Sequence, residues 1–324
     1  MSDAPASILV YVGLDRFGDG LMKLPFARAL RSTWPQARVT WLAGKGETVY
    51  AGRLGGLVTG LIDEVIQNAG IGLSAKELFK ERPLPDRRFD LILDTQRRFA
   101  TSLVVRRIRH RRYISGTAGW LLSDARSPRD EKSPAMIRQM LDLIEAASGQ
   151  PAAPGRARIR LSPEIERQAA QLLPDSRLHV GLVPGAGDRR KCWPLERFIA
   201  LGQRLGSPAI LLGPDETEWH AALREALPRA SFPLQATALG ADPALSLAVG
   251  RRLKVAVAND AGMGHLLAAG DCPLISLFGP TPARKFAPFA EHLTVIEAQS
   301  FGSDEMAAIP FEAVAAAIDG HLRD

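Results

Sequence analysis

The sequence has few of the features that mark exported or membrane-spanning proteins. Only two cysteines, Cys192 and Cys272, occur in 324 residues, so neither a disulfide framework nor a CxxC metal site is indicated. No uninterrupted apolar run reaches the roughly 20 residues that a membrane-spanning helix needs. The N-terminus also lacks the basic segment and apolar core of a signal peptide. We therefore expect a soluble cytoplasmic protein.

Several common ligand-binding motifs are absent as well. The segment Gly13–Gly20 has glycines at 13, 18 and 20, so it is not GxGxxG, and it lacks the Lys and Ser/Thr of a P-loop. A dinucleotide oxidoreductase and an NTPase are therefore disfavoured. The chain contains no Asp-x-Asp, and none of its six histidines has metal-ligand spacing. A transferase without that metal clamp has to neutralise a departing diphosphate with cations and helix dipoles, so we expect no metal and no other cofactor.

Positive charge is concentrated in the first half of the chain. Residues 1–150 contain 23 basic and 16 acidic residues, a net of +7, whereas residues 151–324 contain 18 and 19, a net of −1. This asymmetry favours an acidic partner for the first half, and we expect a glycan or glycolipid rather than a nucleic acid. The alternative is that arginine is simply abundant, since 33 of the 41 basic residues are Arg.

Short apolar runs alternate with longer amphipathic stretches along the chain. This alternation predicts βαβ units and parallel sheets. We expect strands at Ile8–Val12, Val39–Leu42, Leu91–Leu93, Tyr113–Ser115, Val180–Val183, Ala209–Leu212, Val255–Ala258 and Leu274–Phe278. We expect helices at Leu21–Thr33, Ser74–Lys80, Ser102–Ile108, Ala135–Ala147, Glu164–Leu173, Leu195–Leu205, Glu218–Leu227, Ala244–Arg252, Gly264–Ala269 and Phe311–Leu322.

A segment rich in proline and glycine, Gly149–Gly155, interrupts this pattern and is typical of a linker. It divides the chain into two Rossmann-like domains, residues 1–150 and 156–324. Ligands of such sheets bind outside the carboxyl ends of the strands. We therefore expect an α/β protein whose two domains face each other across a cleft that holds both binding sites.

The first segment with chemical potential is Gly13–Gly20, between the first strand and the first helix. Gly18 and Gly20 allow a tight turn and a close approach to a ligand. Asp19 falls at the start of the helix, where the helix dipole keeps a carboxylate ionised and able to accept a proton. The alternative is an ordinary helix-capping aspartate.

Two further segments follow strands in the second half. In Pro184–Pro194, a Gly-Ala-Gly turn precedes Arg189, Arg190 and Lys191, which suits a diphosphate, although a solvated basic loop is the alternative. In Asn259–His265, a glycine-containing turn opens a helix whose first amides suit a phosphate, with His265 as a further donor or as a structural histidine. Phe278–Thr281 is a third turn at a strand end. Together these turns predict that residues 157–300 bind a phosphorylated ligand that is a nucleotide.

Taken in order, these segments resemble glycosyltransferase family nine, the ADP-heptose:lipopolysaccharide heptosyltransferases. Arg16–Pro25 matches R-x-G-D-x-L-x-x-x-P, and Asp94–Gln96 resembles a D-x-Q segment of the acceptor domain. Lys191–Pro194 matches K-x-W-P, and Gly213–Glu216 resembles G-x-P-x-E, although it is one residue shorter. Asn259–His265 matches D-T-G-x-x-H, and Phe278–Thr281 matches F-G-P-T. The resemblance covers nearly the whole chain.

The resemblance implies a GT-B fold and an inverting, metal-independent transfer of a sugar, expected to be heptose from ADP-heptose, to a lipopolysaccharide core or related glycan. It implies that Asp19 is the catalytic base in an acceptor-binding N-terminal domain. It also implies a nucleotide-sugar-binding C-terminal domain whose last helix crosses back to the first. The implied donor-binding residues are Arg189, Arg190, Lys191, Glu216, Asp260, Ala261, Gly262, Met263, Gly264, His265 and Thr281. On the acceptor side we expect Gly18, Lys23, Asp94, Gln96, Arg97 and Arg98.

Three departures from the family pattern bear on specificity. Ala261 stands where Thr is usual, Arg97 where Gly is usual, and Lys23 where a small or hydroxyl residue is usual. The last two concern the acceptor side. The family acts at the cytoplasmic face of the inner membrane, so peripheral contact with an anionic membrane is expected. Two other hypotheses stay open here: a nucleotide-sugar epimerase of the same fold, and a catalytically inactive nucleotide-sugar-binding protein.

Overall fold

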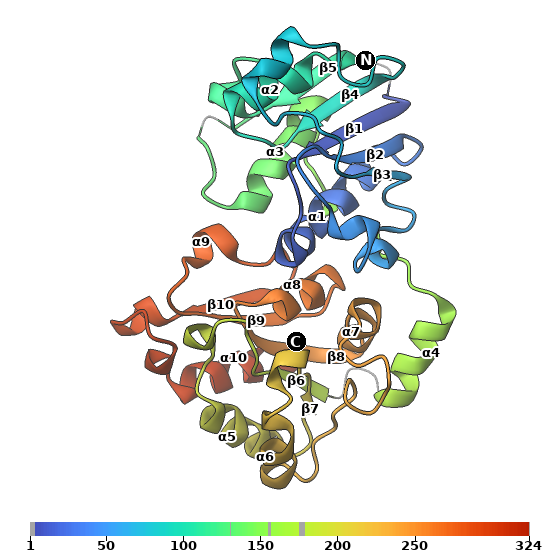
Figure 1. Ribbon diagram of the computed structural model, residues 1–324. Coiled ribbons are helices and arrows are strands. Elements are labelled where there is room, and N and C mark those ends of the chain that lie inside the picture. The colour runs from blue at the N-terminus through green and yellow to red at the C-terminus, as the bar shows by residue number, and fades with distance from the viewer. Residues whose placement is uncertain (1–3, 130, 155–156, 175–178, 324) are drawn as a thin grey trace. The chain divides into compact units, whose positions relative to one another are not determined.

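The structure is a computed structural model that describes residues 4–129, 131–154, 157–174 and 179–323 (Figure 1). The chain divides into two compact units, residues 1–160 and 161–324. Each unit contains one five-stranded sheet in which every described strand pair is parallel. This α/β architecture, with helices between the strands, agrees with the prediction of two Rossmann-like domains.

The sheet of the first unit has the strand order β3-β2-β1-β4-β5. Its strands are β1 (Ser7–Val12), β2 (Arg38–Ala43), β3 (Glu64–Ile66), β4 (Arg88–Asp94) and β5 (Arg109–Ser115). The α-helices are α1 (Phe17–Thr33), α2 (Phe99–Arg106) and α3 (Met136–Ser148), and the 3-10 turns are η1 (Val49–Ala51), η2 (Gly55–Val58), η3 (Ala75–Phe79) and η4 (Thr117–Trp120). The order reverses between β1 and β4, which makes their carboxyl ends the topological switch point.

Burial explains why β1 occupies the centre of this sheet. Its residues Ile8–Val12 are fully buried, as expected for a parallel strand covered on both faces. On one face, Leu9 and Tyr11 pack in a core with Val104 and Val105 of α2. Helices α1 and α3 contact each other, and α3 also contacts β5. The sheet thus fixes the loop that follows β1 and leads into α1, whose first turn contains Asp19.

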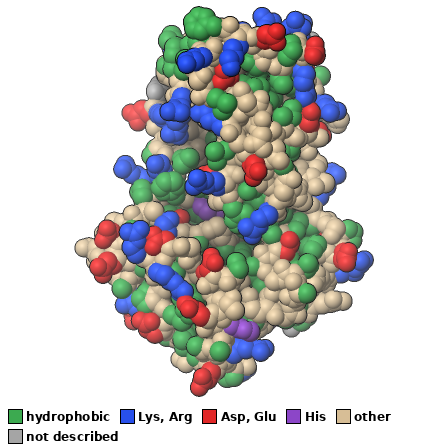
Figure 2. All heavy atoms as spheres, viewed as in Figure 1, with side chains coloured by type: hydrophobic (Ala, Val, Ile, Leu, Met, Phe, Trp, Pro, Cys, Tyr) green, Lys and Arg blue, Asp and Glu red, His purple; other side chains and the backbone are tan. Residues whose placement is uncertain are grey.

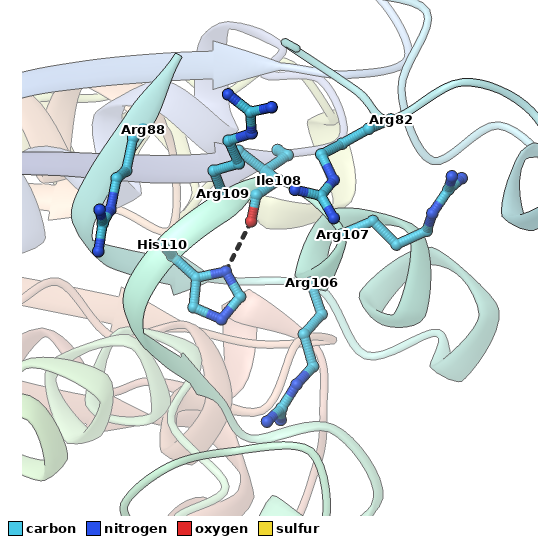
Figure 3. Close-up of a pocket in the computed structure, with 7 residues that line it drawn as sticks. All are labelled: Arg82, Arg88, Arg106, Arg107, Ile108, Arg109 and His110. Atoms are coloured by element: carbon cyan, nitrogen blue, oxygen red, sulfur yellow. Dashed lines mark hydrogen bonds between the residues drawn. The ribbon is translucent and has the colours of Figure 1, made fainter. Parts of the chain in front are cut away.

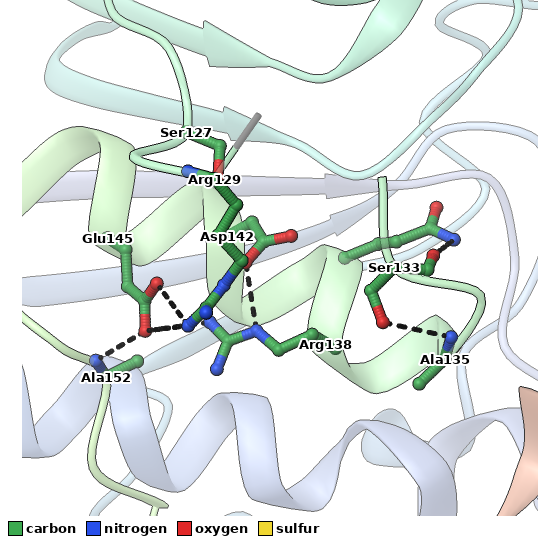
Figure 4. Close-up of polar contacts among 9 residues, drawn as sticks. Ser127, Arg129, Ser133, Ala135, Arg138, Asp142, Glu145 and Ala152 are labelled. Atoms are coloured by element: carbon green, nitrogen blue, oxygen red, sulfur yellow. Dashed lines mark hydrogen bonds and ion pairs between the residues drawn. The ribbon is translucent and has the colours of Figure 1, made fainter. Parts of the chain in front are cut away.

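A buried ionic network anchors α3 (Figure 4). The carboxylates of Asp142 and Glu145, each about 5% exposed or less, are paired with the guanidinium groups of Arg129 and Arg138. Glu145 also accepts a hydrogen bond of 3.1 Å from the amide of Ala152. Because buried charges are tolerated when paired and hydrogen-bonded, this network holds the chain after α3 against the first unit.

The sheet of the second unit has the order β10-β9-β8-β6-β7. Its strands are β6 (His179–Val183), β7 (Ala209–Ile210), β8 (Leu253–Asn259), β9 (Leu274–Phe278) and β10 (Leu293–Glu297). The α-helices are α4 (Pro163–Leu172), α5 (Leu195–Leu205), α6 (Trp219–Ala226), α7 (Pro243–Gly250), α8 (Gly262–Ala269), α9 (Ala283–Phe286) and α10 (Phe311–Arg323), and the 3-10 turns are η6 (Arg189–Lys191), η7 (Pro214–Glu216), η8 (Ala298–Phe301) and η9 (Met306–Ala308).

Two apolar layers cover this second sheet. One contains side chains of α5, α6 and α10, with Phe198 and Leu223 among them, packed on Val255 and Val257 of β8. The other contains side chains of α4, α7 and α8 packed on the opposite face. The order reverses between β6 and β8, so the switch point of this unit lies at their carboxyl ends.

The division between the two units lies later in the chain than the sequence-based expectation. The predicted linker began at Gly149, which ends α3 in the left-handed conformation, and its last residue, Gly155, lies outside the described residues. The chain continues on the first unit as far as Arg160, because the Arg28 Nε–H donates to the Ala157 carbonyl at 2.6 Å and Ile159 is buried. The apolar face of helix α10 (Val314, Ile318) packs in the core of the second unit. That this last helix crosses back to the first unit stays a prediction.

The first unit has many Lys and Arg side chains on its surface. Figure 2 shows Lys and Arg side chains spread over the visible face of this unit, in the upper part of the view. Within the described residues, no helix has the combined length and apolar character needed to cross a bilayer.

Candidate active site

The candidate donor site lies at the carboxyl edge of the second sheet. The loops after β7, β6, β8 and β9, which are neighbouring strands, all leave the sheet at this edge. They carry the predicted segments Gly213–Glu216, Pro184–Pro194, Asn259–His265 and Phe278–Thr281. Topology therefore brings together four segments that are up to 97 positions apart in sequence, as Pro184 and Thr281 are.

Asn259 joins the loops at the switch point. Its side chain is fully buried, its Oδ1 accepts the backbone N–H of Trp193 at 3.0 Å, and its Nδ2 donates to the carbonyl of Pro184 at 2.8 Å. Trp193 is itself buried, and its indole N–H donates to the Ile309 carbonyl at 3.0 Å. The side-chain amide of Asn259 therefore fixes both ends of the loop that carries Lys191, at Pro184 and Trp193, relative to the start of α8.

Lys191, Asp260 and Thr281 meet at this edge, although they come from three separate segments. The Lys191 Nζ lies 2.7 Å from Asp260 Oδ2, and the Thr281 hydroxyl donates to the same oxygen. The Asp260 side chain is nearly buried, whereas that of Lys191 is about a quarter exposed. An ammonium group is thus held in place on one side and remains accessible to a ligand.

His265 and the amino end of α8 adjoin this cluster. Burial lowers the pKa of His265 to about 4, against the opposing effect of Asp260 and with a smaller contribution from Lys191. The ring is therefore neutral at pH 7 and offers one N–H donor. Ala261 is the N-cap residue of α8 and supplies no side-chain hydrogen bond to the first turn. The amides of Gly262 and Met263 are therefore available for an anion at the positive end of the helix dipole.

Glu216 lies against the loop after β6. Its Oε2 accepts the N–H of Gly213 at 2.8 Å, and burial, more than any other cause, raises its pKa. A Cβ atom added to Gly185 would come within 2.2 Å of Glu216 Cδ. Only glycine at position 185 allows this close approach. From the sequence, the glycines of this segment indicated only a turn.

The two arginines predicted to bind the diphosphate have other partners. Arg189 forms an ion pair with Glu218, and its guanidinium lies 4.2 Å from the ring centroid of Trp219. Arg190 is largely exposed and pairs with Asp188 at 2.8 Å. The prediction grouped three cations, but the structure brings only Lys191 to Asp260, because η6 turns successive side chains in different directions.

Asp19 occupies the third position of α1, after the N-cap residue Arg16. It is half-buried, and its Oδ2 accepts the N–H of Arg16 at 3.2 Å. Asp19 is therefore not the N-cap residue considered from the sequence, but it caps the helix start from the N3 position. Only one carboxylate oxygen is used by this contact, and Gly18 beside it is exposed with no heavy atom within 4 Å of its would-be Cβ. Space beside Asp19 is thus compatible with an acceptor.

Lys23 does not present a free cation to an acceptor. Its Nζ pairs with the buried carboxylate of Asp15, which also accepts hydrogen bonds of 2.9 Å from Trp41 Nε1 and Thr48 Oγ1. Asp15 was missed in the sequence, where nothing distinguishes it from other loop aspartates. Its buried position and three partners show that it holds the turn before Asp19, so Lys23 is structural.

Asp94 likewise has an internal role at the end of β4. It is 1% exposed and accepts hydrogen bonds from the hydroxyls of Ser102 (2.5 Å), Tyr113 (2.6 Å) and Ser115 (3.2 Å). Burial raises its pKa and the hydroxyl donors oppose this. It also accepts the backbone N–H of Gln96 at 2.9 Å. The predicted acceptor contact is therefore not available to Asp94, which instead positions Gln96.

Besides Gly18, the acceptor-side predictions that remain accessible are Gln96, Arg97 and Arg98. Gln96 is half-buried and adjoins Gly13 at the switch point, since a Cβ on Gly13 would lie 3.1 Å from Gln96 Oε1. Arg97 is exposed, and its guanidinium donates to Gln139 of α3 at 2.5 Å. Arg98, the N-cap residue of α2, is exposed. The carboxyl edge of the first sheet therefore carries an amide and two guanidinium groups.

Comparison with known proteins gives a consistent result. The family model of glycosyltransferase family 9 (heptosyltransferase) matches residues 80–307. Lipopolysaccharide heptosyltransferase 2 of Salmonella typhimurium is 25% identical over 311 residues, which cover 89% of this chain and 87% of that protein.

Two solved structures have the same fold. The glycosyltransferase family 9 protein of Veillonella parvula superposes with a TM-score of 0.70 at 19% identity, covering 98% of this chain and 97% of that one. The E. coli heptosyltransferase WaaC with ADP-2-deoxy-2-fluoro heptose gives a TM-score of 0.63 at 19% identity, covering 97% and 99%. Because the family model spans well over half of the sequence, the chain belongs to glycosyltransferase family 9, the heptosyltransferases, and is a glycosyltransferase.

Proposed function

We propose that this enzyme transfers heptose from ADP-heptose to a lipopolysaccharide core or a related acidic glycan, with inversion at the anomeric carbon and without a metal ion. The observation that carries the proposal is the convergence of Lys191, Asp260, Thr281 and the start of α8 at one sheet edge. Relatives described as lipopolysaccharide heptosyltransferase 2 and as a heptosyltransferase bound to an ADP-heptose analogue support the choice of donor and acceptor.

In the proposed reaction, Asp19 accepts the proton of an acceptor hydroxyl. That oxygen forms a bond to the anomeric carbon, the bond from this carbon to the β-phosphate oxygen breaks, and ADP leaves with the electron pair. A carboxylate such as that of Asp19 is a weak base for a sugar hydroxyl. Proton transfer is therefore coupled to formation of the new glycosidic bond.

The leaving diphosphate is stabilised by Lys191, by the neutral N–H of His265 and by the amides of Gly262 and Met263. Such fixed donors act where charge develops in the transition state. Asp260 holds Lys191 in position and contacts the donor sugar, and Thr281 orients Asp260. Glu216, next to Gly185, contacts the ribose, with Ala261 and Gly264 contributing backbone contacts. Arg189 and Arg190 would have to leave Glu218 and Asp188 to join them.

On the acceptor side, Gln96, Arg97 and Arg98 bind the acidic glycan, with Gly18 leaving room beside the base. Lys23 affects this site only by pairing with Asp15, and Asp94 affects it only by positioning Gln96. We place the enzyme in the cytoplasm, in peripheral contact with the anionic inner face of the inner membrane. No step of this reaction uses a cofactor.

The proposal is tested by incubating the enzyme with ADP-heptose and a heptose-deficient lipopolysaccharide core and analysing the products by mass spectrometry and NMR. We expect a mass increase of one heptose, the inverted anomeric configuration and full activity in EDTA. An Asp19→Asn variant should lose about a hundredfold or more in rate while retaining donor affinity, the scale of a lost general base.

Three outcomes would contradict parts of the proposal. Isomerisation of the donor without any acceptor would identify an epimerase. Loss of activity in EDTA that magnesium restores would contradict the metal-free mechanism. Near-normal turnover of Asp19→Asn would reduce Asp19 to a helix cap.

A further inference from the structure

A cationic cavity lies on the first unit, away from the carboxyl edge of its sheet (Figure 3). Its volume is about 420 Å³. Five arginines line it, and they are Arg82, Arg88, Arg106, Arg107 and Arg109. His110 and the backbone around Ile108 complete the lining, and none of the described lining residues is acidic. Cavities of this volume lie in the range of small-molecule binding sites.

The position of the cavity separates it from the proposed acceptor site. Arg88 begins β4 and Arg109 begins β5, so the cavity lies at the amino ends of these strands. Asp94, which positions Gln96, ends β4 six residues later. At about 3.3 Å per residue, the two ends of this strand lie roughly 20 Å apart. A ligand in the cavity therefore does not occupy the acceptor contacts proposed above.

Two of the five guanidinium groups are held by the protein itself. Arg107 donates to the Lys80 carbonyl at 2.6 Å and also to the Glu77 carbonyl. Arg106 pairs with Asp124 at 3.2 Å and lies over the Tyr113 ring. Backbone carbonyls fix Arg107 without neutralising its charge, so this side chain stays cationic beside the cavity.

The other three arginines have no carboxylate partner among the described residues, and these are Arg82, Arg88 and Arg109. Figure 3 shows these three side chains around Ile108 and His110, with the guanidinium groups of Arg88 and Arg109 pointing in different directions. Like charges gathered around one cavity repel each other, and an anion that carries several charges removes this repulsion. Guanidinium groups also match the oxygen geometry of phosphate better than other cationic side chains do.

His110 adds a directed polar group to the cavity. Its Nδ1 lies 2.6 Å from the Ile108 carbonyl, and since a carbonyl only accepts, Nδ1 carries the proton. In the neutral ring Nε2 is then a hydrogen-bond acceptor, which can accept the hydroxyl hydrogen of a protonated phosphate group. The ring is shown beside the lining arginines in Figure 3.

We infer that this cavity is a second anion-binding site of the enzyme, which takes a phosphomonoester or diphosphate group. The group can belong to a soluble phosphorylated molecule or to a phospholipid headgroup, because the recognising chemistry is the same. The site is distinct from the donor and acceptor sites, so its occupancy does not depend on the identity of the transferred sugar.

The test uses pyrophosphate as the probe in a Lys191→Ala background, which weakens the competing donor site. Binding is followed through the NMR signals of the His110 ring, assigned with a His110→Gln variant. We expect saturable shifts, and an affinity loss of at least about tenfold in Arg88→Gln/Arg109→Gln, the scale of lost charge-assisted hydrogen bonds. The control Arg167→Gln/Arg229→Gln removes the same charge from exposed positions of the second unit and should change the affinity less than twofold.

A second arm distinguishes the two sources of the phosphate. Sedimentation with phosphatidylcholine vesicles, with and without phosphatidic acid, shows whether a lipid headgroup is bound through the same arginines. Vesicle binding that is lost in Arg88→Gln/Arg109→Gln but kept in the control identifies the headgroup, whereas binding of pyrophosphate alone identifies a soluble ligand. Absence of both responses, or equal losses in the two double variants, would overturn the inference.

Discussion

At the scale of single residues, the ion pair between Lys191 and Asp260 is the central feature of the proposed donor site. The contact of 2.7 Å holds the ammonium group before any ligand is present, which lowers the conformational cost of binding. A diphosphate brought next to Lys191 then gains a charge-assisted hydrogen bond. This predicts that Lys191→Ala weakens ADP binding by about 10- to 100-fold, since such a bond contributes roughly 1.5–3 kcal/mol. Isothermal titration with ADP measures the effect.

Arg190→Ala is the matched control for this variant. Arg190 is the adjacent cation, but it is exposed and pairs with Asp188 at 2.8 Å. Its removal should change ADP affinity less than threefold. Equal losses for the two variants would show that the basic segment acts through its net charge and that the position of Lys191 is unimportant.

His265 gives the donor site a specific pH dependence. Its pKa is lowered to about 4 in the folded protein, mainly by burial, from an ordinary value near 6.5. The unfolded chain therefore takes up this proton first as pH falls. The contribution to stability is fully present above about pH 6.5 and is lost as pH falls towards 4. His265→Asn lacks this proton uptake, so its melting temperature should fall less than that of the wild type between pH 6.5 and pH 4.5.

Calorimetric scans of the two proteins at matched ionic strength test this prediction. Both share all other titrating groups, so the difference between their melting temperatures isolates His265. A difference that stays constant over this pH interval would show that the ring is not desolvated in the folded enzyme.

The residues that sequence reasoning could and could not find differ in the kind of contact they make. Lys191, Asp260 and Thr281 lie in short segments at strand ends, and parallel topology brings such segments together. Asp15 and Asn259 act through buried side-chain contacts whose partners are 8 to 75 positions away. No local spacing encodes those contacts. For the same reason, the internal roles of Lys23 and Asp94 became visible only in the structure.

At the scale of elements, the loop between β6 and η6 is held by the close approach of Gly185 to Glu216. A Cβ atom at position 185 would lie 2.2 Å from Glu216 Cδ, well inside van der Waals contact. Gly185→Ala must therefore displace Glu216 or the loop, at a cost of about 1–3 kcal/mol, as for other overpacked sites. We predict a lower melting temperature and at least about fivefold weaker ADP binding for this variant.

Gly187→Ala makes the same chemical change two residues later in the same loop. A Cβ at this position meets no heavy atom within 4 Å. Its stability and ADP affinity should stay close to those of the wild type. If both variants behave alike, the flexibility of the loop matters and the contact with Glu216 does not.

Two of the four edge strands, β3 and β10, were missed in the sequence. β3 and β10 are half-buried, so their residues show neither a continuous apolar run nor clean alternation. The central strands β1 and β8 were recognisable because both of their faces are covered. The stretch Ser74–Lys80 was expected to be an α-helix and forms the 3-10 turn η3. There the Glu77 carboxylate accepts backbone N–H groups of Leu73 and Ser74 and stabilises a single tight turn.

At the scale of the whole molecule, charge is distributed unevenly between the two halves of the chain. Residues 1–150 carry a net charge of +7, and residues 151–324 carry −1. The second unit is nearly neutral, so in the proposed donor site a single positioned cation, Lys191, matters more than net charge. A basic first unit attracts anions over its whole surface, which raises encounter rates with an acidic acceptor and makes them dependent on salt.

Arg97 and Arg98 lie at the carboxyl edge of the sheet of this unit, immediately after Gln96. Arg97 is oriented by Gln139 at 2.5 Å, and both residues are exposed. We predict that Arg97→Gln/Arg98→Gln raises the KM for the acidic acceptor by about tenfold or more, because up to two charge-assisted contacts are lost. The affinity for ADP should not change. Arg167→Gln/Arg229→Gln, with the same loss of charge on the second unit, should leave both constants near their wild-type values.

Initial rates at several salt concentrations complete the measurement. The KM of the wild type should rise with salt more steeply than that of the Arg97/Arg98 variant, because screening removes the attraction that the variant already lacks. An unchanged KM in this variant would show that the acidic acceptor is recognised elsewhere on the first unit.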